Sequence, residues 1–279
     1  MQKFEVAGHE PSLVPDGYSC TLCFSDEFDL PVLDRTKWSF RKHLFHKEHE
    51  CWIEDEGIAF KDGNIIFKLV EKCGKYYSSQ LQTGENWYDR PGVGDWNVAK
   101  LSTPKFQHKF GYYEVRCRMQ NGDNWWSSFW LQSPNIGTML DEKRAGVEVD
   151  IMESFFGNTY IPHWLHWGGY GADYKNQSTK PSPGYSTEDD IIPLDEGYHR
   201  FGVLWEEDGY TFYVDGKQDG PKLSGAVSHT EQFILLGTEA VGYRRYIPGI
   251  YKVRAQNIIK DDVFMVDYVR VFDCTKNNT

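Results

Sequence analysis

Apolar and aromatic residues occur along the chain in short runs that are separated by turn-forming residues. Residues 111–119 alternate strictly, so that the side chains at 113, 115, 117 and 119 share one face and the charged side chains share the other. Comparable runs occur at 63–70, 201–205, 210–214, 232–236 and 264–272. A period of two is typical of half-buried strands, whereas helical periodicity over a dozen residues is hard to find. The pattern therefore predicts an all-β fold with two antiparallel sheets, as a sandwich or a barrel.

Composition sets bounds on size and partners. The chain has 279 residues, of which 40% are hydrophobic and 25% charged, as in an ordinary globular protein. No apolar run approaches the ~18 residues of a membrane helix, so we expect no membrane partner. The formal net charge of −11 argues against nucleic acid, which requires a concentrated basic surface. Aromatic residues make up 16% of the chain and supply flat faces on which a ligand can stack.

Six cysteines are too few for a fold built on disulfides. Cys20 and Cys23 have the spacing of a metal or redox pair, but no second pair follows to complete a zinc site. Buried thiols or a disulfide are the alternatives. The N-terminal residues contain no apolar stretch like that of a signal peptide, which leaves the compartment open. We expect a cytoplasmic protein if Met1 is the native start, and a secreted or periplasmic one if a leader was removed.

The strongest candidate chemistry lies in residues 146–153. Glu148 and Asp150 alternate with aliphatic residues and share one strand face, whereas strict alternation would turn Glu153 to the other face. A β-bulge at 151–152 would return Glu153 to the acidic face, and bulges often re-aim side chains beside active sites. Crowding raises the pKa of at least one carboxyl group, and glycoside hydrolysis needs one protonated acid beside an ionised one. The alternative is a solvated strand face that happens to be acidic.

Aromatic residues near this segment favour the catalytic interpretation. Trp125, Trp126 and Trp130 lie close together in sequence, and residues 163–167 combine two tryptophans with two histidines just after the acids. Sugar rings have apolar faces and polar edges, so clefts that bind them combine tryptophan with hydrogen-bonding groups. Tryptophan clusters more often belong to a core, but clusters that succeed one another toward an acidic strand favour a sugar-binding cleft.

The spacing Glu148-x-Asp150-x-x-Glu153 resembles the signature of glycoside hydrolase family 16, in the version that carries a bulge. Further segments resemble the family's strands in the expected order, at 24–29 with 33–38, 79–83, 110–116, 126–130, 199–205, 212–216 and 266–271. The resemblance runs nearly end to end and implies a two-sheet antiparallel β-jelly-roll sandwich with a concave substrate cleft. We expect one catalytic domain over residues 1–279, in which residues 1–20 form an N-terminal extension.

The resemblance also implies endo-acting, retaining cleavage of a β-linked polysaccharide by a monomer that needs no cofactor for catalysis. Glu148 would be the nucleophile, Glu153 the general acid/base, and Asp150 would lie between them and tune both. With the bulge discounted, the two glutamates lie about 13 Å apart along the strand. Inward-leaning side chains can reduce this distance to the ~5–5.5 Å of a retaining pair. The implied sugar-binding surface contains Trp125, Trp126, Trp130, His166 and Glu239.

The identity of the β-glycan is less clearly indicated. Family members that cleave plain β-1,3-glucan often have a Trp-Pro pair shortly before the first glutamate, but residues 142–147 contain neither. They also commonly have a Gly-Gly pair with a following Trp where this chain has residues 238–245. Four arginines could contact a galactose-based or anionic glycan or could be solvated, namely Arg90, Arg144, Arg244 and Arg245. A β-galactan is slightly favoured over a β-1,3- or mixed-linkage glucan, and a non-catalytic carbohydrate-binding module is a further alternative.

Two metal sites are also suggested. Many family members hold a calcium ion on the convex face, and the resemblance assigns Glu27, Gly63 and Asp267 to this structural site. Oxygen ligands of this kind suit Ca²⁺. In residues 43–51, histidines recur every three positions before a cysteine, which suggests a transition-metal site, although the flanking residues resemble a cleft-edge loop.

Overall fold

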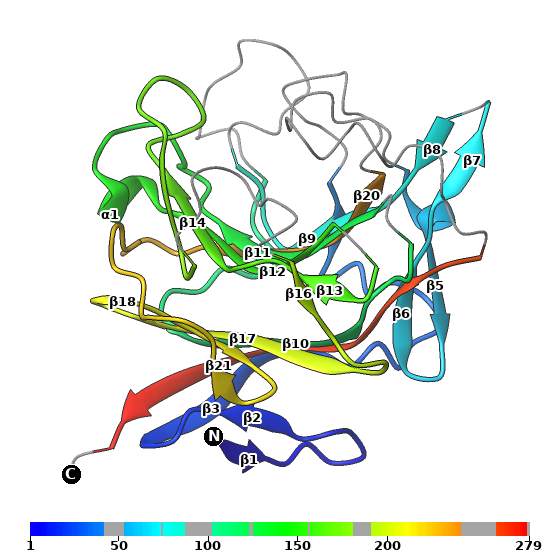
Figure 1. Cartoon of the computed structure of the whole chain (residues 1–279), viewed down its shortest axis with the longest axis horizontal. Coiled ribbons are helices and arrows are strands. Elements are labelled where there is room, and N and C mark those ends of the chain that lie inside the picture. The colour runs from blue at the N-terminus through cyan, green and yellow to red at the C-terminus, as the bar shows by residue number, and fades with distance from the viewer. Residues whose placement is uncertain are drawn as a thin grey trace.

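The computed structural model describes residues 1–41, 53–73, 75–86, 102–122, 125–155, 157–180, 191–240 and 261–277. Strands dominate these ranges, as predicted, and two large antiparallel sheets face each other (Figure 1). The helices in the described ranges are short, namely α1 (Glu142–Ala145) and the 3₁₀ turn η2 (Asp55–Gly57). None is long and apolar enough to cross a membrane.

The first large sheet, which we call the β12 sheet, has seven strands within the described residues. Their order is β15 (Lys175–Ser178), β14 (Trp164–Trp167), β12 (Glu148–Ser154), β11 (Trp125–Gln132), β20 (Phe233–Ala240), β9 (Gln80–Gln82) and β4 (Ser39–Phe40). The predicted strand at 146–153 thus lies inside the sheet, with hydrogen-bonded neighbours on both sides.

The second large sheet, the β21 sheet, has eight strands in the described ranges. Its path is β19 (Lys217–Gln218), β18 (Gly209–Val214), β17 (His199–Glu206), β10 (Gly111–Arg118), β21 (Phe264–Lys276), β6 (Asn64–Phe67) and β5 (Ile58–Lys61), and β3 (Tyr18–Asp26) also pairs with β21. Smaller antiparallel pairs are formed by β1 (Gln2–Phe4) with β2 (Ser12–Val14), β7 (Val70–Lys72) with β8 (Lys75–Tyr77), and β13 (Thr159–Tyr160) with β16 (Ile192–Pro193).

The hydrophobic core lies between the two large sheets. Val115 and Cys117 of β10 belong to one buried cluster with Val149 and Ile151 of β12. The alternation predicted for 111–119 is confirmed on this side, because the side chains at 113, 115, 117 and 119 are at most 3% exposed. Burial of this apolar surface holds the two sheets together, since each Å² removed from water contributes about 25 cal/mol of stabilising free energy.

The opposite face of β10 is covered by the N-terminal segment around Glu114, whereas Arg118 at its end is exposed. Glu114 is fully buried, and its carboxylate accepts hydrogen bonds from the backbone N–H of Leu13 at 3.1 Å and from the Tyr268 hydroxyl at 2.7 Å. Burial raises the pKa of Glu114, while these hydrogen bonds lower it. Figure 1 shows β1 and β2 on the side of the β21 sheet that faces away from the β12 sheet.

A buried arginine completes the attachment of the N-terminal segment. Arg270 of β21 donates to the backbone carbonyl of Glu10 at 2.8 Å and to the Ser12 hydroxyl at 3.0 Å. Its guanidinium also binds both carboxylate oxygens of Glu27 and lies over the ring of Tyr268. Glu10 and Ser12 thus supply two of the hydrogen bonds that the buried Arg270 guanidinium requires. The N-terminal segment is therefore part of the folded unit.

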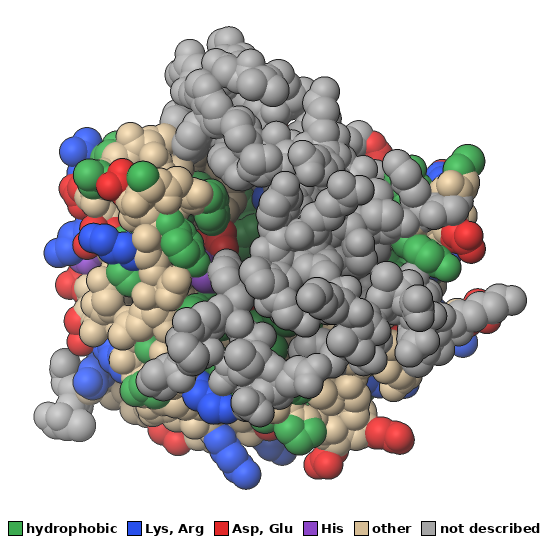
Figure 2. Space-filling model, turned by 45° about the horizontal axis from the view of Figure 1, so that its top comes forward, with side chains coloured by type: hydrophobic (Ala, Val, Ile, Leu, Met, Phe, Trp, Pro, Cys, Tyr) green, Lys and Arg blue, Asp and Glu red, His purple; other side chains and the backbone are tan. Residues whose placement is uncertain are grey.

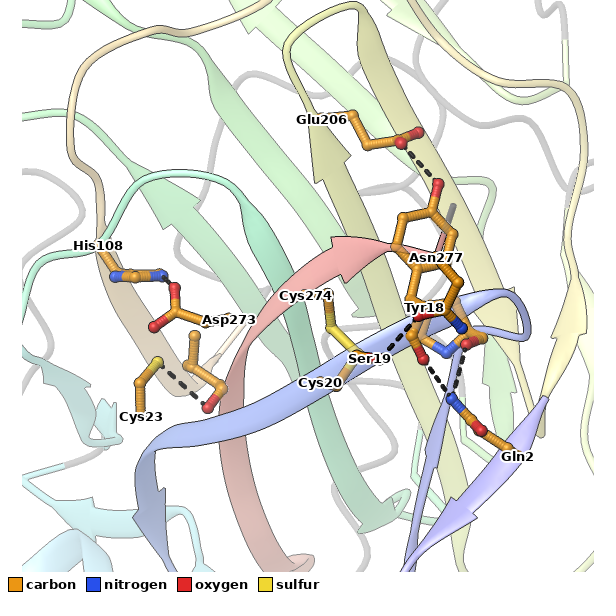
Figure 3. The surroundings of a disulfide bond; sticks show 12 residues. Gln2, Tyr18, Ser19, Cys20, Cys23, His108, Glu206, Asp273, Cys274 and Asn277 are labelled. Carbon is orange, nitrogen blue, oxygen red and sulfur yellow. Dashed lines mark hydrogen bonds and ion pairs between the residues drawn. A yellow bond between two sulfur atoms is a disulfide. The ribbon is translucent and has the colours of Figure 1, made fainter. Parts of the chain in front are cut away.

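A disulfide cross-links β3 to β21 at one end of this strand pair, near the start of β3 and the end of β21. Cys20 of β3 faces Cys274 of β21 directly in the antiparallel register, and the two are bonded (Figure 3). Cys23 keeps a free, exposed thiol. The Cys20–Cys23 spacing therefore does not form a metal or redox pair, because Cys20 is committed to a partner 254 residues away.

Candidate active site

The local geometry of β12 brings its acidic side chains together. The pairing of β12 with β11 shifts by one residue at Ile151, which has no partner on β11 and forms a β-bulge. The bulge predicted at this place is confirmed, and both Ile151 and Met152 are fully buried in the core. Glu148, Asp150 and Glu153 consequently line one cleft on the β12 sheet.

The cleft collects side chains from several strands of the β12 sheet. It is lined by Gln80, Trp126, Ser128, Trp130, Glu148, Asp150, Glu153, His166 and Glu239. Of the residues expected to bind sugar, Trp126, Trp130, His166 and Glu239 therefore lie beside the acids. The backbone of Trp125 starts β11, but its side chain lies outside the described residues. Figure 2 shows acidic and histidine atoms recessed between hydrophobic side chains on this face.

Neutral hydrogen-bond donors surround Glu148. The side-chain amide of Gln132 donates to Glu148 Oε2 at 2.9 Å. The Tyr170 hydroxyl donates to the same oxygen and contacts the Gln132 amide. Donors that point at one carboxylate oxygen stabilise its negative charge and fix the direction of the other oxygen. The site thus presents Glu148 as an oriented carboxylate.

Asp150 is paired with a histidine from the neighbouring strand β14. His166 Nε2 lies 3.0 Å from Asp150 Oδ2, and both side chains are buried. The other ring nitrogen, Nδ1, lies 2.6 Å from the Tyr174 hydroxyl, and the imidazole stacks on Trp164. Contacts on both ring nitrogens fix the orientation of the imidazole. Asp150 is therefore a buried acid whose partner, the His166 imidazole, is held in one orientation.

Glu153 is buried, like Asp150, whereas Glu148 is only partly buried. The Trp126 indole Nε1–H donates to Glu153 Oε1 at 2.7 Å. Desolvation by burial raises the pKa of Glu153 well above its ordinary value, and the charge of Asp150 raises it further. His166 and the Trp126 hydrogen bond oppose this shift. Glu153 therefore keeps its proton to higher pH than an ordinary glutamic acid, and burial contributes more to this than crowding does.

The arrangement gives two glutamates on one strand face different surroundings. The Gln132 amide and the Tyr170 hydroxyl orient the Glu148 side chain, while Glu153 lies where the neutral acid is favoured. A carboxylate can attack an electrophilic carbon, and a carboxylic acid can protonate a leaving oxygen. The site can therefore supply a nucleophile and a general acid to the same bond.

Several residues of the site were missed by the sequence analysis. Gln80 lines the cleft from β9, and Gln132 and Tyr170 bind Glu148. Gln132 continues the even-numbered face of β11 that carries the cleft tryptophans, so alternation could have indicated it. Tyr170 follows β14 outside any strand, and no periodic signal marks it.

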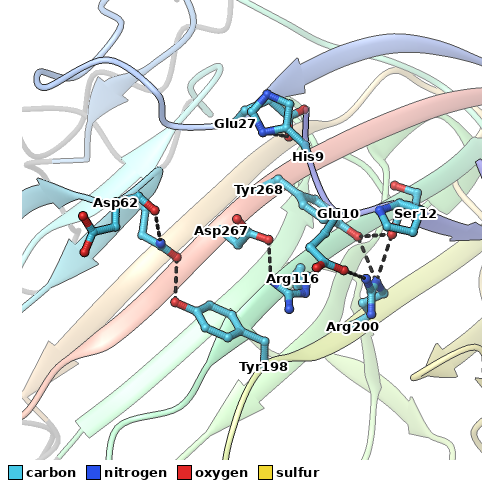
Figure 4. Close-up of polar contacts among 12 residues, drawn as sticks. His9, Glu10, Ser12, Glu27, Asp62, Arg116, Tyr198, Arg200, Asp267 and Tyr268 are labelled. Atoms are coloured by element: carbon cyan, nitrogen blue, oxygen red, sulfur yellow. Dashed lines mark hydrogen bonds and ion pairs between the residues drawn. The ribbon is translucent and has the colours of Figure 1, made fainter. Parts of the chain in front are cut away.

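Two of the residues expected to bind calcium, Glu27 and Asp267, are engaged by arginines. Glu27 accepts two hydrogen bonds from Arg270, at 3.0 and 2.7 Å, and Asp267 lies 2.5 Å from the Arg116 guanidinium (Figure 4). An arginine bound in this way occupies the oxygens and balances the charge that Ca²⁺ would require. Glu27 and Asp267 therefore do not fit a calcium site in this arrangement.

Other expectations fall on parts of the chain that are not described. Residues 43–51, with their spaced histidines, lie outside the described ranges, as do Arg90, Arg244 and Arg245. Arg144 is described, lies in α1, and is exposed. A different cation lies beside a cleft residue, because the buried Arg41 guanidinium is 5.0 Å from the ring centroid of Trp130.

Comparison with known proteins identifies related chains. A family model described as the GH16 domain of beta-porphyranases A–D matches residues 21–274. A beta-1,3-glucan-binding protein of Penaeus monodon is 30% identical over 229 residues, which cover 70% of this chain and 60% of that protein. Beta-porphyranase E of Zobellia galactanivorans is 25% identical over 209 residues, which cover 70% of this chain and 65% of that protein. The chain thus spans less than two thirds of the length of either relative.

A solved structure supports the fold. The catalytic domain of an endo-1,3-beta-glucanase (laminarinase) from Thermotoga petrophila has a TM-score of 0.61 and 22% identity to this chain, and the match covers 91% of this chain and 98% of that one. The predicted all-β fold with two antiparallel sheets is confirmed by this likeness and by the sheet topology.

Proposed function

Because the chain belongs to glycoside hydrolase family 16, we propose that it is a retaining endo-β-glycosidase that hydrolyses internal linkages of a β-linked polysaccharide. The observation that carries this proposal is the contrast between two glutamates on one face of β12. Glu148 is oriented by the Gln132 amide and the Tyr170 hydroxyl, whereas burial raises the pKa of Glu153. Double displacement requires a nucleophile that is held in position and an acid that keeps its proton, and these surroundings support both roles.

In the first step a Glu148 oxygen attacks the anomeric carbon and forms a glycosyl ester. The bond between that carbon and the glycosidic oxygen breaks, and Glu153 gives its proton to the departing oxygen. In the second step Glu153 takes a proton from water, the water oxygen attacks the anomeric carbon, and Glu148 leaves as a carboxylate. Asp150, paired with His166, keeps a negative charge beside Glu153 and helps it to regain its proton.

A β-galactan is the favoured substrate class. The matching family model is that of beta-porphyranases, and beta-porphyranase E is among the relatives. The sequence also lacks the Trp-Pro pair that precedes the first glutamate in many β-1,3-glucanases. The buried Arg41 guanidinium beside Trp130 offers a cation next to an aromatic platform, which suits a glycan with anionic substituents.

A β-1,3-glucan is the second candidate. The relative from Penaeus monodon, at 30% identity, is named for binding this polymer. The name of this relative also suggests a second role, in which the protein binds the glucan without cleaving it. The retention of Glu148, Asp150 and Glu153 in one cleft favours hydrolysis instead.

A reducing-end assay on a panel of polysaccharides tests both the activity and the substrate. The panel contains porphyran, agarose, keratan sulfate, laminarin and a mixed-linkage glucan, and we expect the highest rate on a galactan. Glu148→Gln should lower kcat by at least about 10³-fold, because the amide is nearly isosteric but is a poor nucleophile. Glu196→Gln, an exposed change that lies outside the cleft, is the matched control and should keep full activity.

The outcomes of the assay are distinct. The highest rate on laminarin or the mixed-linkage glucan would replace the galactan by a glucan and leave the mechanism intact. Glycan binding with no product from any polymer would make the protein a binding module. NMR of the initial products should show the β-anomer, since an α-anomer would mean inversion and exclude Glu148 as nucleophile.

A further inference from the structure

Three potential metal ligands meet on the β21 sheet, away from the catalytic acids of the β12 sheet. They are the Cys23 thiol of β3, the His108 imidazole that precedes β10, and the Asp273 carboxylate of β21 (Figure 3). Their ligand atoms all lie within 4.8 Å of one another. Separate segments of the chain thus contribute a sulfur, a nitrogen and an oxygen to one small volume.

The backbone holds each ligand in place. In the pairing of β3 with β21, the register shifts between Val271 and Phe272, and Cys23 is the extra residue that has no partner on β21. This bulge re-aims the Cys23 side chain. His108 is fixed by a reciprocal pair of backbone hydrogen bonds to Gln232, at 3.0 and 2.9 Å. The three donors are therefore positioned by sheet structure.

The histidine nitrogen that faces this cluster lies beside the carboxylate. His108 Nε2 is 2.9 Å from Asp273 Oδ1, and the two form an ion pair when the imidazole is protonated (Figure 3). A neutral imidazole and the carboxylate can instead both turn toward a cation, which replaces the proton between them. Asp273 is mostly exposed, so water can reach the open side of the cluster.

We propose that Cys23, His108 and Asp273 bind one Zn²⁺ ion, with water completing a tetrahedral shell. Bond lengths near 2.0–2.3 Å place neighbouring ligand atoms about 3.3–3.8 Å apart, so small side-chain rotations suffice. On binding, the Cys23 thiol releases its proton to solvent and its sulfur donates an electron pair to the metal. The thiolate and the carboxylate together neutralise the charge of the ion.

Other uses of Cys23 fit the geometry less well. Partial desolvation of the thiol, together with the nearby Asp273, raises the pKa of Cys23 to about 11, which disfavours a reactive thiolate nucleophile in the metal-free protein. Its thiol donates to the carbonyl oxygen of Val271 at 3.3 Å. Because the cluster joins β3, β21 and the segment before β10, the ion would act as a structural cross-link.

Cobalt titration of the untagged, disulfide-intact protein tests the site. We expect one equivalent of Co²⁺ to produce a thiolate charge-transfer band in the near ultraviolet, together with the visible bands of tetrahedral cobalt. Zn²⁺ should displace the cobalt and raise Tm. Cys23→Ser should abolish the charge-transfer band, and Asp273→Asn should weaken binding by about tenfold or more.

Matched variants separate this cluster from other possible sites. Cys73→Ser removes another exposed thiol and should leave the titration unchanged. Cys51→Ser removes the thiol that follows the spaced histidines and should also leave it unchanged. Cobalt bound by Glu148, Asp150 and His166, whose ligand atoms also lie close together, would give no thiolate band.

The proposal is overturned if no charge-transfer band develops in the wild-type protein. It is also overturned if the band survives Cys23→Ser, or is lost in Cys51→Ser. Near-ultraviolet circular dichroism and thermal unfolding show whether each variant folds. If Cys23→Ser does not fold, His108→Gln replaces it, and an unchanged zinc affinity in that variant would equally exclude the site.

Discussion

The carboxyl group of Glu153 links catalysis to folding stability. Burial raises its pKa in the folded protein above the ordinary value of 4.5, so the folded state binds this proton more tightly than the unfolded chain does. The resulting stabilisation is complete below that ordinary value and is lost as the pH rises through the folded pKa. At neutral pH the wild-type protein is thus less stable than a variant with an uncharged side chain at position 153 would be.

Glu153→Gln should therefore raise Tm at neutral and alkaline pH. The amide has a similar shape and no titration, and each kcal/mol recovered corresponds to about 2–4 °C. The difference between variant and wild type should shrink as the pH falls below 4.5. Thermal unfolding followed by circular dichroism over a pH series measures this. A Tm difference that does not change with pH would contradict the raised pKa.

Two neighbours of Glu153 should shift the basic limb of the kcat/KM pH profile in opposite directions when they are replaced. The charge of Asp150 raises the pKa of Glu153, so Asp150→Asn should move the basic limb to lower pH. The Trp126 hydrogen bond lowers that pKa, so Trp126→Phe should move the limb to higher pH. Because the three acids interact, the apparent pKa of this limb describes them as a group and not Glu153 alone. Shifts of the same sign in both variants would contradict the contact geometry.

Single residues differ in how far the sequence could reveal them. The three acids were found because their spacing in one strand is visible locally. Tyr170 and Gln132 were not, because their contact with Glu148 depends on how separate strands are placed. The sequence could not show that Glu27, one of the residues assigned to calcium, pairs with an arginine 243 residues away.

At the scale of the element, the bulge in β12 makes a specific stability prediction. Ile151 and Met152 are both buried, whereas strict alternation would direct Met152 into the cleft. Met152→Ala should therefore destabilise the protein by about 2–5 kcal/mol, as a core truncation does. Ile151→Ala, which faces the core in either case, is the matched control. Urea unfolding measures both, and a cost below about 0.5 kcal/mol for Met152→Ala would argue against the bulge.

Strand periodicity predicted the faces of the elements but not what covers them. The side chains of β10 at 113, 115, 117 and 119 are in the core, as their alternation predicts. Glu114 on the opposite face is buried as well, because the N-terminal segment packs over it through Leu13 and Ser12. Alternation identifies two faces and carries no information about a distant segment that docks on one of them.

At the scale of the whole molecule, this docking predicts that the N-terminal segment contributes to stability. Deletion of residues 1–16 would remove the Glu10 carbonyl and the Ser12 hydroxyl from Arg270, which is fully buried. A buried charge that loses partners is strongly destabilising, so Tm should fall by several degrees, at about 2–4 °C per kcal/mol. The active site lies on the other large sheet, so kcat/KM well below Tm should change little.

Glu10→Gln provides the control for this deletion. It breaks only the ion pair with Arg200, in which the Glu10 side chain is 54% exposed, and should cost less than about 1 kcal/mol. Thermal unfolding compares the two variants. An unchanged Tm after the deletion would show that the segment is dispensable for folding. The family model begins only at residue 21, after the deleted segment.

The overall architecture was predictable because many short strands with turns between them leave few ways to bury their apolar faces. The disulfide was not predictable, since cysteine spacing alone does not determine which cysteines pair. Cys20 and Cys274 become neighbours only when the first long strand and the last one lie side by side in the β21 sheet.

That bond makes the polypeptide a covalent ring with two short tails, 1–19 and 275–279. A protease that cuts once anywhere between Cys20 and Cys274 opens the ring but releases no fragment. Nicked protein should run as one species of full mass on a non-reducing gel and as two pieces after reduction. It should also keep its fold as long as the sheets on either side of the cut stay paired.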